Sequence, residues 1–154
     1  MRNLWPPPFL TVKLTADGRE FLLHRDWLDE HQTKAMAVFL SDWGAEVLRK
    51  SSNWLLDGTF RSTLAPFAQI YIVMALSETT NTGLPCGFSL LPSKEPAAYN
   101  KMMTTIQSKV GEVGTKLENI VTDVEPALFN TLLECYPDID YVGCQFHFRA
   151  VVWK

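Results

Sequence analysis

The sequence lacks the features that mark secreted and membrane-spanning proteins. Its three cysteines, Cys86, Cys135 and Cys144, show no framework spacing, so we expect reduced thiols in an intracellular protein. Three prolines at 6–8 interrupt the first residues before an apolar run develops, so we expect no secretory signal peptide. No stretch approaches the roughly 20 apolar residues that a transmembrane helix needs. We therefore expect a protein that is not secreted and has no membrane partner.

Positive charge is also scarce. The chain has 14 Lys and Arg against 17 Asp and Glu, a formal net charge of −3, which argues against a strongly basic nucleic-acid groove. Its tryptophans are not interleaved with basic residues, so no base-stacking stripe is visible, and the sequence shows no localisation signal. A hydrophobic content of 47% and a charged content of 20% over 154 residues are typical of one globular domain.

The apolar pattern predicts an α/β fold. Apolar residues at three- and four-residue steps predict a helix at 29–50, after a possible short hairpin around Asp17-Gly18. Further strands are predicted at 54–56, 67–76, 85–91, 119–122 and 141–146, with helices at 96–110 and 126–135 and the start of another at 147–154. Short links favour an antiparallel meander for the first three of these strands, and crossover helices favour parallel addition of the last two. This is the order of the ribonuclease H-like fold, a mixed sheet of three antiparallel strands followed by parallel ones.

Two aspartates stand where predicted apolar strands end. Asp57 follows the strand at 54–56, and Asp123 follows the strand at 119–122. Carboxylates delivered by the ends of two neighbouring strands can hold a divalent cation, which is the core of metal-assisted phosphoryl transfer. Each has an alternative interpretation: Asp57-Gly58 is a common hairpin turn pair. Asp123 could cap the following helix, because Thr122-x-x-Glu125 resembles a capping box.

A third feature, Cys144-x-x-His147, follows the last predicted strand. The pair supplies half of the four ligands that a structural zinc needs, so zinc binding is weakly supported by spacing alone. The alternative is a buried thiol beside an ordinary histidine.

Several blocks in this order resemble the transposase domain of Mutator-like elements, the MULE transposases. The resemblance runs from about residue 39 to residue 152. Its main blocks are Asp57-Gly58-Thr59-Phe60, Pro85-x-Gly87-Phe88-Ser89-Leu90-Leu91-Pro92, Thr122-Asp123-x-Glu125 and Gly143-Cys144-x-Phe146-His147-Phe148. We accordingly expect residues 36–154 to form a partial ribonuclease H-like transposase domain and residues 1–35 to form an N-terminal extension.

The resemblance implies an enzyme of the DDE/D type that cuts and joins DNA in the nucleus. By residue match, Asp57 and Asp123 would be metal ligands for Mg²⁺ or Mn²⁺ and hence catalytic. Cys144 and His147 would match the family's Cys-x-x-His pair as structural support. DNA is the partner that the resemblance implies.

The third acidic residue of the family comes later in the sequence than any match in this chain. No residue up to Lys154 corresponds to it, so we expect a domain that is incomplete at its C-terminal side. One hypothesis is a transposase-derived core for DNA cutting and strand transfer, completed by a partner chain. The alternative is a catalytically inactive, domesticated or remnant domain that acts in protein or DNA binding, with a protein partner covering the incomplete face.

Overall fold

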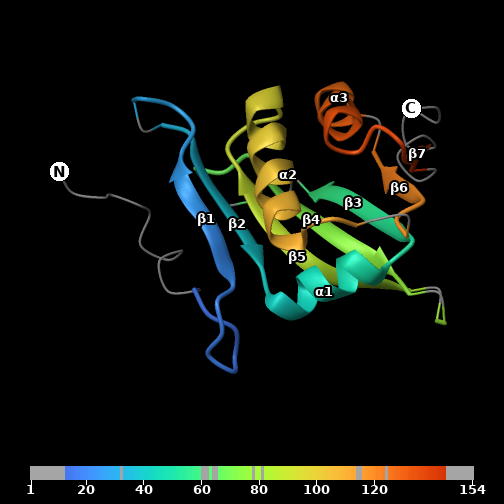
Figure 1. The fold of residues 1–154 in the computed structure, drawn as a ribbon. Helices are drawn as coiled ribbons and strands as arrows, with labels where there is room; N and C mark the ends of the chain where they lie inside the picture. Colours follow the sequence, from blue (N-terminus) through green and yellow to red (C-terminus); the bar gives the residue numbers. More distant parts are fainter. Residues whose placement is uncertain are drawn as a thin grey trace.

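The computed structural model describes residues 13–31, 33–59, 63, 66–77, 79–80, 82–113, 116–123 and 125–144. Within these ranges the chain forms one mixed sheet with helices packed on one face (Figure 1). In chain order the elements are β1 (Leu22–Trp27), β2 (Ala35–Leu40), α1 (Asp42–Lys50), β3 (Asn53–Thr59), β4 (Gln69–Leu76), β5 (Gly83–Leu91), α2 (Pro96–Val110), β6 (Asn119–Thr122), α3 (Pro126–Cys135) and β7 (Asp140–Gly143). None of the helices in these ranges has the length and hydropathy of a membrane span.

The sheet has the strand order β1-β2-β5-β4-β3-β6-β7. In this order each strand from β1 through β2, β5 and β4 to β3 is antiparallel to the next. β6 then pairs with β3 in parallel, and β7 pairs with β6 in parallel. The predicted α/β class is therefore confirmed, as are the meander of β3, β4 and β5 and the two parallel additions through α2 and α3. β3 is the strand at which the sheet changes from antiparallel to parallel pairing.

The helix predicted at 29–50 is wrong in its first half, because Ala35–Leu40 forms strand β2. All six side chains of β2 are buried, three in the main core and three on the opposite face of the sheet. A short apolar run of this kind fits a buried strand as well as a helix, and pairing with both β1 and β5 decides the outcome. The helix α1 begins only at Asp42, where the Ser41 hydroxyl accepts a hydrogen bond from the Gly44 amide at 3.0 Å.

The N-terminal hairpin around Asp17-Gly18 is present in a reduced form. An isolated antiparallel bridge joins Leu14 to Glu20, and Gly18 adopts a φ of 82° in the turn between them. The chain then continues into β1, which lies at the edge of the same sheet. The residues expected to form an N-terminal extension therefore contribute an edge strand, and the boundary drawn between residues 35 and 36 falls at the start of β2.

The main core lies between the sheet and the helices. It is built from fully buried side chains that include Trp54, Tyr71, Tyr99, Ile106, Ile120 and Leu128. The indole N–H of Trp54 donates a 2.9 Å hydrogen bond to the carbonyl of Leu48 on α1. Its ring also meets that of Tyr136 edge-on, with centroids 5.5 Å apart. Trp54 thus ties β3 to α1 and to the end of α3.

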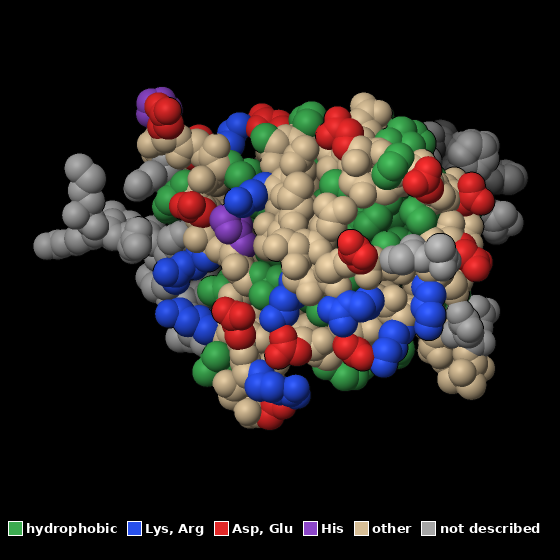
Figure 2. Space-filling model, viewed as in Figure 1, with side chains coloured by type: hydrophobic (Ala, Val, Ile, Leu, Met, Phe, Trp, Pro, Cys, Tyr) green, Lys and Arg blue, Asp and Glu red, His purple; other side chains and the backbone are tan. Residues whose placement is uncertain are grey.

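The helix-bearing face carries charges of both signs (Figure 2). Around α1 they form ion pairs, with Lys109–Asp42 and Lys50–Glu46 both at 2.6 Å. Hydrophobic side chains gather over α3, where Phe129 and Leu133 are each 40% exposed. The visible surface is therefore not dominated by positive charge.

Candidate active site

Asp57 lies inside β3 and not in a turn. It pairs with Ile72 of β4, and Gly58 pairs with Tyr71. The hairpin interpretation of Asp57-Gly58 is therefore wrong. The glycine serves close packing instead, because a Cβ added at Gly58 would stand 2.8 Å from Cε2 of Tyr71 and 3.3 Å from the side-chain oxygen of Gln69. The carboxylate of Asp57 is on an exposed residue.

Asp123 follows directly after β6, beside Asp57. The last paired residues of the parallel strands β3 and β6 are Leu56 and Thr122. Asp57 and Asp123 are the next residues along the chain, Asp57 still within β3 and Asp123 just past the end of β6. Neighbouring strands lie about 4.8 Å apart. The backbones of Asp57 and Asp123 are therefore side by side at the carboxyl edge of the parallel half of the sheet.

The Asp123 carboxylate is held from one side. The Tyr71 hydroxyl donates to Oδ1 at 3.0 Å, and the Thr122 hydroxyl donates to the same oxygen at 3.3 Å. Both hydrogen bonds go to Oδ1, and no hydrogen bond from another described residue reaches Oδ2. The capping interpretation of Asp123 is wrong, because the N-cap residue of α3 is Glu125 and its helix start has no side-chain cap.

A buried polar chain lies behind Asp123. Tyr71 meets Tyr99 edge-on with ring centroids 5.8 Å apart, and the Tyr99 hydroxyl accepts a 3.0 Å hydrogen bond from the side-chain amide of Gln69. Burial, followed by the negative charge of Asp123, raises the pKa of Tyr71 well above its usual value. Burial likewise raises the pKa of Tyr99 to about 12. Both phenols therefore keep their protons at neutral pH, and Tyr71 remains a donor to Asp123.

Tyr71 is the residue of this site that the sequence patterns did not single out. It sits within a long apolar strand, where an aromatic residue is most simply a core residue. The signal that could have found it is the small residue opposite, because Gly58 leaves room for a ring to cross β3.

A charged pair borders the site. Lys94, just after β5, forms a 2.8 Å ion pair with Glu125 at the start of α3, and the Glu125 side chain is 20% exposed. Glu125 therefore stands two residues from Asp123 but is engaged by a lysine. Glu134, the other carboxylate near the motif in sequence, lies on α3 and lines a separate cavity with residues of α2.

Cys144 takes the corresponding position after β7. Gly143 pairs with Thr122, and the Cys144 amide donates to the Thr122 carbonyl at 2.7 Å. Its thiol is free and partly buried. His147, the other member of the predicted Cys144–His147 pair, lies outside the described residues. Among the described residues, no group of three or more His, Cys, Asp or Glu side chains could hold a metal ion.

The donor set at this edge suits a hard divalent cation. Mg²⁺ prefers oxygen ligands, keeps several waters, and is bound by one or two carboxylates together with substrate phosphates. Asp57 and Asp123 supply two carboxylates from adjacent backbone positions, and Oδ1 of Asp123 is held by Tyr71 and Thr122. The residues present therefore fit Mg²⁺ or Mn²⁺ better than zinc, which favours histidine and cysteine.

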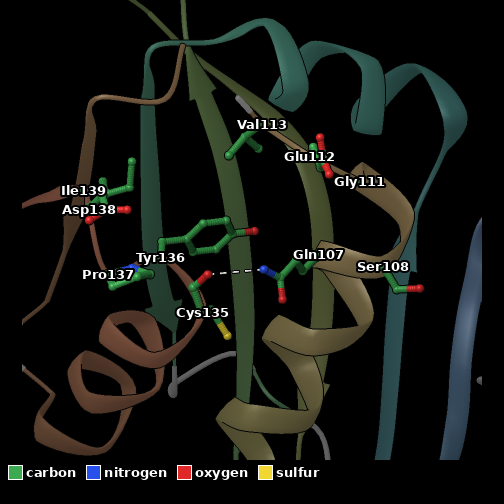
Figure 3. A pocket seen from close by; sticks show the side chains of 10 residues that line it. All are labelled: Gln107, Ser108, Gly111, Glu112, Val113, Cys135, Tyr136, Pro137, Asp138 and Ile139. Carbon is green, nitrogen blue, oxygen red and sulfur yellow. Dashed lines mark hydrogen bonds between the residues drawn. The ribbon is translucent and has the colours of Figure 1, made fainter. Parts of the chain in front are cut away.

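The cavity shown in Figure 3 lies away from this site. Its volume is about 520 Å³, and its walls come from the ends of α2 and α3 and the residues that follow them. The Gln107 side-chain amide joins the two helices there by a 3.2 Å hydrogen bond to the Cys135 carbonyl. These segments lead into the amino ends of β6 and β7, whereas the aspartates stand at the carboxyl edge. The cavity is thus not part of the aspartate site.

Comparison with known families identifies the chain. A sequence model of the MULE transposase domain matches residues 53–150. The match begins at the start of β3 and includes Asp57, Asp123 and Cys144. Comparison with curated proteins finds no match. Since the family match covers more than half of the chain, this protein belongs to the MULE transposase domain family.

Proposed function

We propose that this domain is the core of a DNA-cutting and strand-transferring enzyme of the ribonuclease H-like type, with Asp57 and Asp123 as its metal ligands. The observation that carries the proposal is the parallel register of β3 and β6, which aligns the two aspartates at one edge of the sheet. The order β5-β4-β3-β6-β7, an antiparallel meander followed by two parallel strands, supports the ribonuclease H-like assignment. β1 and β2 extend that sheet beyond β5.

The chemistry assigned to the chain is the binding of a catalytic cation. When bound, Mg²⁺ or Mn²⁺ lowers the pKa of an attacking water or 3′-hydroxyl and stabilises negative charge on the phosphate oxygens. Asp57 and Asp123 offer the anionic ligands, and the hydrogen bonds to Oδ1 restrict rotation of the Asp123 carboxylate. A third carboxylate is supplied, in this proposal, from outside the 154 residues. Action on DNA makes the nucleus the expected location.

Isothermal titration with Mn²⁺ tests the proposal directly. The wild-type protein is expected to bind, and Asp57→Asn or Asp123→Asn is expected to weaken binding at least about tenfold, because each removes half of the anionic charge. Asp138→Asn is the matched control, since Asp138 is an exposed aspartate at the distant cavity. Identical heats for the wild type and both site variants would refute the metal site. Mn²⁺-dependent nicking of supercoiled DNA, lost in Asp57→Asn, would extend it to catalysis.

A second candidate function is favoured by exposed apolar side chains near the β7 edge. Phe129 and Leu133 are each 40% exposed and Val142 is 46% exposed. An apolar surface of this kind suits a catalytically inactive domain that binds a protein partner. The Mn²⁺ titration also discriminates between the two candidate functions, because a protein-binding domain requires no cation binding by Asp57 or Asp123.

A further inference from the structure

We propose that Tyr71 is a positioning residue of this site, whose hydroxyl fixes Oδ1 of Asp123 so that Oδ2 is the oxygen left for a cation. The inference rests on the proposed function and extends it to a residue on a third strand. It starts from the 3.0 Å hydrogen bond between the Tyr71 hydroxyl and Asp123. Loss of a donor that orients a ligating side chain typically lowers metal affinity about 10–100-fold.

The path of the Tyr71 side chain makes this contact unusual. β3 lies between β4, which carries Tyr71, and β6, which leads to Asp123. The phenol must therefore cross β3 to reach the aspartate. It crosses at Gly58, where a Cβ would stand 2.8 Å from Cε2 and 3.0 Å from Cδ2 of the ring. The glycine beside Asp57 thus allows the hydroxyl of one strand to reach the carboxylate two strands away.

The ring is held firmly enough to position another group. Tyr71 is 0% exposed and packs edge-on against Tyr99. Tyr99 is tethered through the side-chain amide of Gln69, which also donates to the Ser93 carbonyl at 3.1 Å. A tyrosine has only two side-chain torsions, and complete burial against Tyr99 restricts them. The donor is consequently placed before any cation arrives.

The alternative is that the hydroxyl serves only to satisfy a buried polar group. Tyr99 provides the matched comparison, because it is an equally buried tyrosine of the same aromatic pair whose hydroxyl binds Gln69 and not Asp123. A purely structural role predicts similar consequences for the loss of either hydroxyl. A positioning role predicts that loss of the Tyr71 hydroxyl lowers cation affinity much more than loss of the Tyr99 hydroxyl.

The experiment is Mn²⁺ titration of Tyr71→Phe, Tyr99→Phe and Asp123→Asn beside the wild type, with thermal unfolding of each. Tyr71→Phe is expected to weaken Mn²⁺ binding about 10–100-fold. Tyr99→Phe keeps the ring that packs on Tyr71 and loses only the hydrogen bond to Gln69, so it is expected to weaken binding much less. An unchanged affinity in Tyr71→Phe, with binding lost in Asp123→Asn, would overturn the positioning role alone. Binding that is insensitive to Asp123→Asn would instead overturn the proposed function together with it.

A second measurement uses the wild-type protein and so does not depend on the folding of a variant. In a Mg²⁺ titration followed by NMR, the phenolic ¹³Cζ of Tyr71 is expected to shift with the same midpoint as cation binding. The shift at Tyr99 should be smaller, because its hydroxyl does not touch Asp123. A Tyr71 resonance that stays fixed while the cation binds would contradict the proposal.

Discussion

The close contact between Gly58 and Tyr71 makes a sharp prediction about stability. In Gly58→Ala the new methyl group would stand 2.8 and 3.0 Å from ring carbons of Tyr71, well inside van der Waals contact. The ring cannot swing away freely, because Tyr71 is fully buried and packs against Tyr99. The substitution therefore forces the ring or β3 to move.

The magnitude follows from two opposing effects. Overpacking a well-packed core costs about 1–3 kcal/mol. Replacing glycine by alanine inside a strand recovers roughly 0.5–1 kcal/mol of backbone entropy. We expect Gly58→Ala to lower the free energy of unfolding by up to about 2.5 kcal/mol, the difference between these effects.

Gly83→Ala on β5 isolates the steric part of this effect. A Cβ at Gly83 would meet Met74 at 3.4 Å or more, an ordinary contact, so this variant should keep the entropic gain without the clash. Urea unfolding followed by tryptophan fluorescence measures both variants. The reasoning is refuted if Gly58→Ala is as stable as Gly83→Ala.

The remaining predictions concern the core and one histidine. Trp54→Phe should lower the free energy of unfolding by roughly 1–3 kcal/mol in the same urea assay. The reason is that the smaller ring leaves a cavity and cannot donate the hydrogen bond to Leu48. An unaltered urea midpoint would contradict the packing described for Trp54. Burial, followed by the charge of Lys101 and against that of Asp26, lowers the pKa of His24. The unfolded chain therefore takes up this proton first as the pH falls below about 6.5, and the folded state loses stability from there down to the lowered pKa. His24→Gln should therefore lose less stability than the wild type over that pH interval. Urea midpoints measured above and below the interval test this, and equal losses in the variant and the wild type would exclude His24 as a contributor.

Elements with strong local signals were predictable from the sequence. α2 and α3 begin at Pro96 and Pro126, where proline suits the first helical turn, and the four-residue run of β6 was predicted with the bounds that the structure has. β2 was not predictable, since a run of six buried residues becomes a strand only through pairing with β1 and β5. Its partner β5 is distant in sequence, and its other partner β1 lies in a region without a strong apolar pattern.

The candidate site likewise has a part that the sequence predicts and a part that it does not. The position of Asp123 after a strand was readable from the apolar run before it, and the alignment of the two aspartates followed from a predicted parallel pair. The expectation that the first strand stops before Asp57 was wrong, because pairing with β4 carries β3 on to Thr59. The contribution of Tyr71 was not readable, because it depends on the order of three strands and on the gap left at Gly58. The pattern of apolar residues along one strand does not indicate that the ring of Tyr71 lies across β3.

The change of pairing at β3 has a consequence for how the protein assembles. The hairpin contacts of β3, β4 and β5 are close in sequence and can form early, whereas β6 must return past the whole of α2 before it pairs with β3. Loop closure of this kind delays long-range parallel pairing. A folding intermediate would then carry Asp57 in place while Asp123 is still unplaced. Any ligand that needs both aspartates would favour only the fully folded chain, and its stabilisation would grow with ligand concentration.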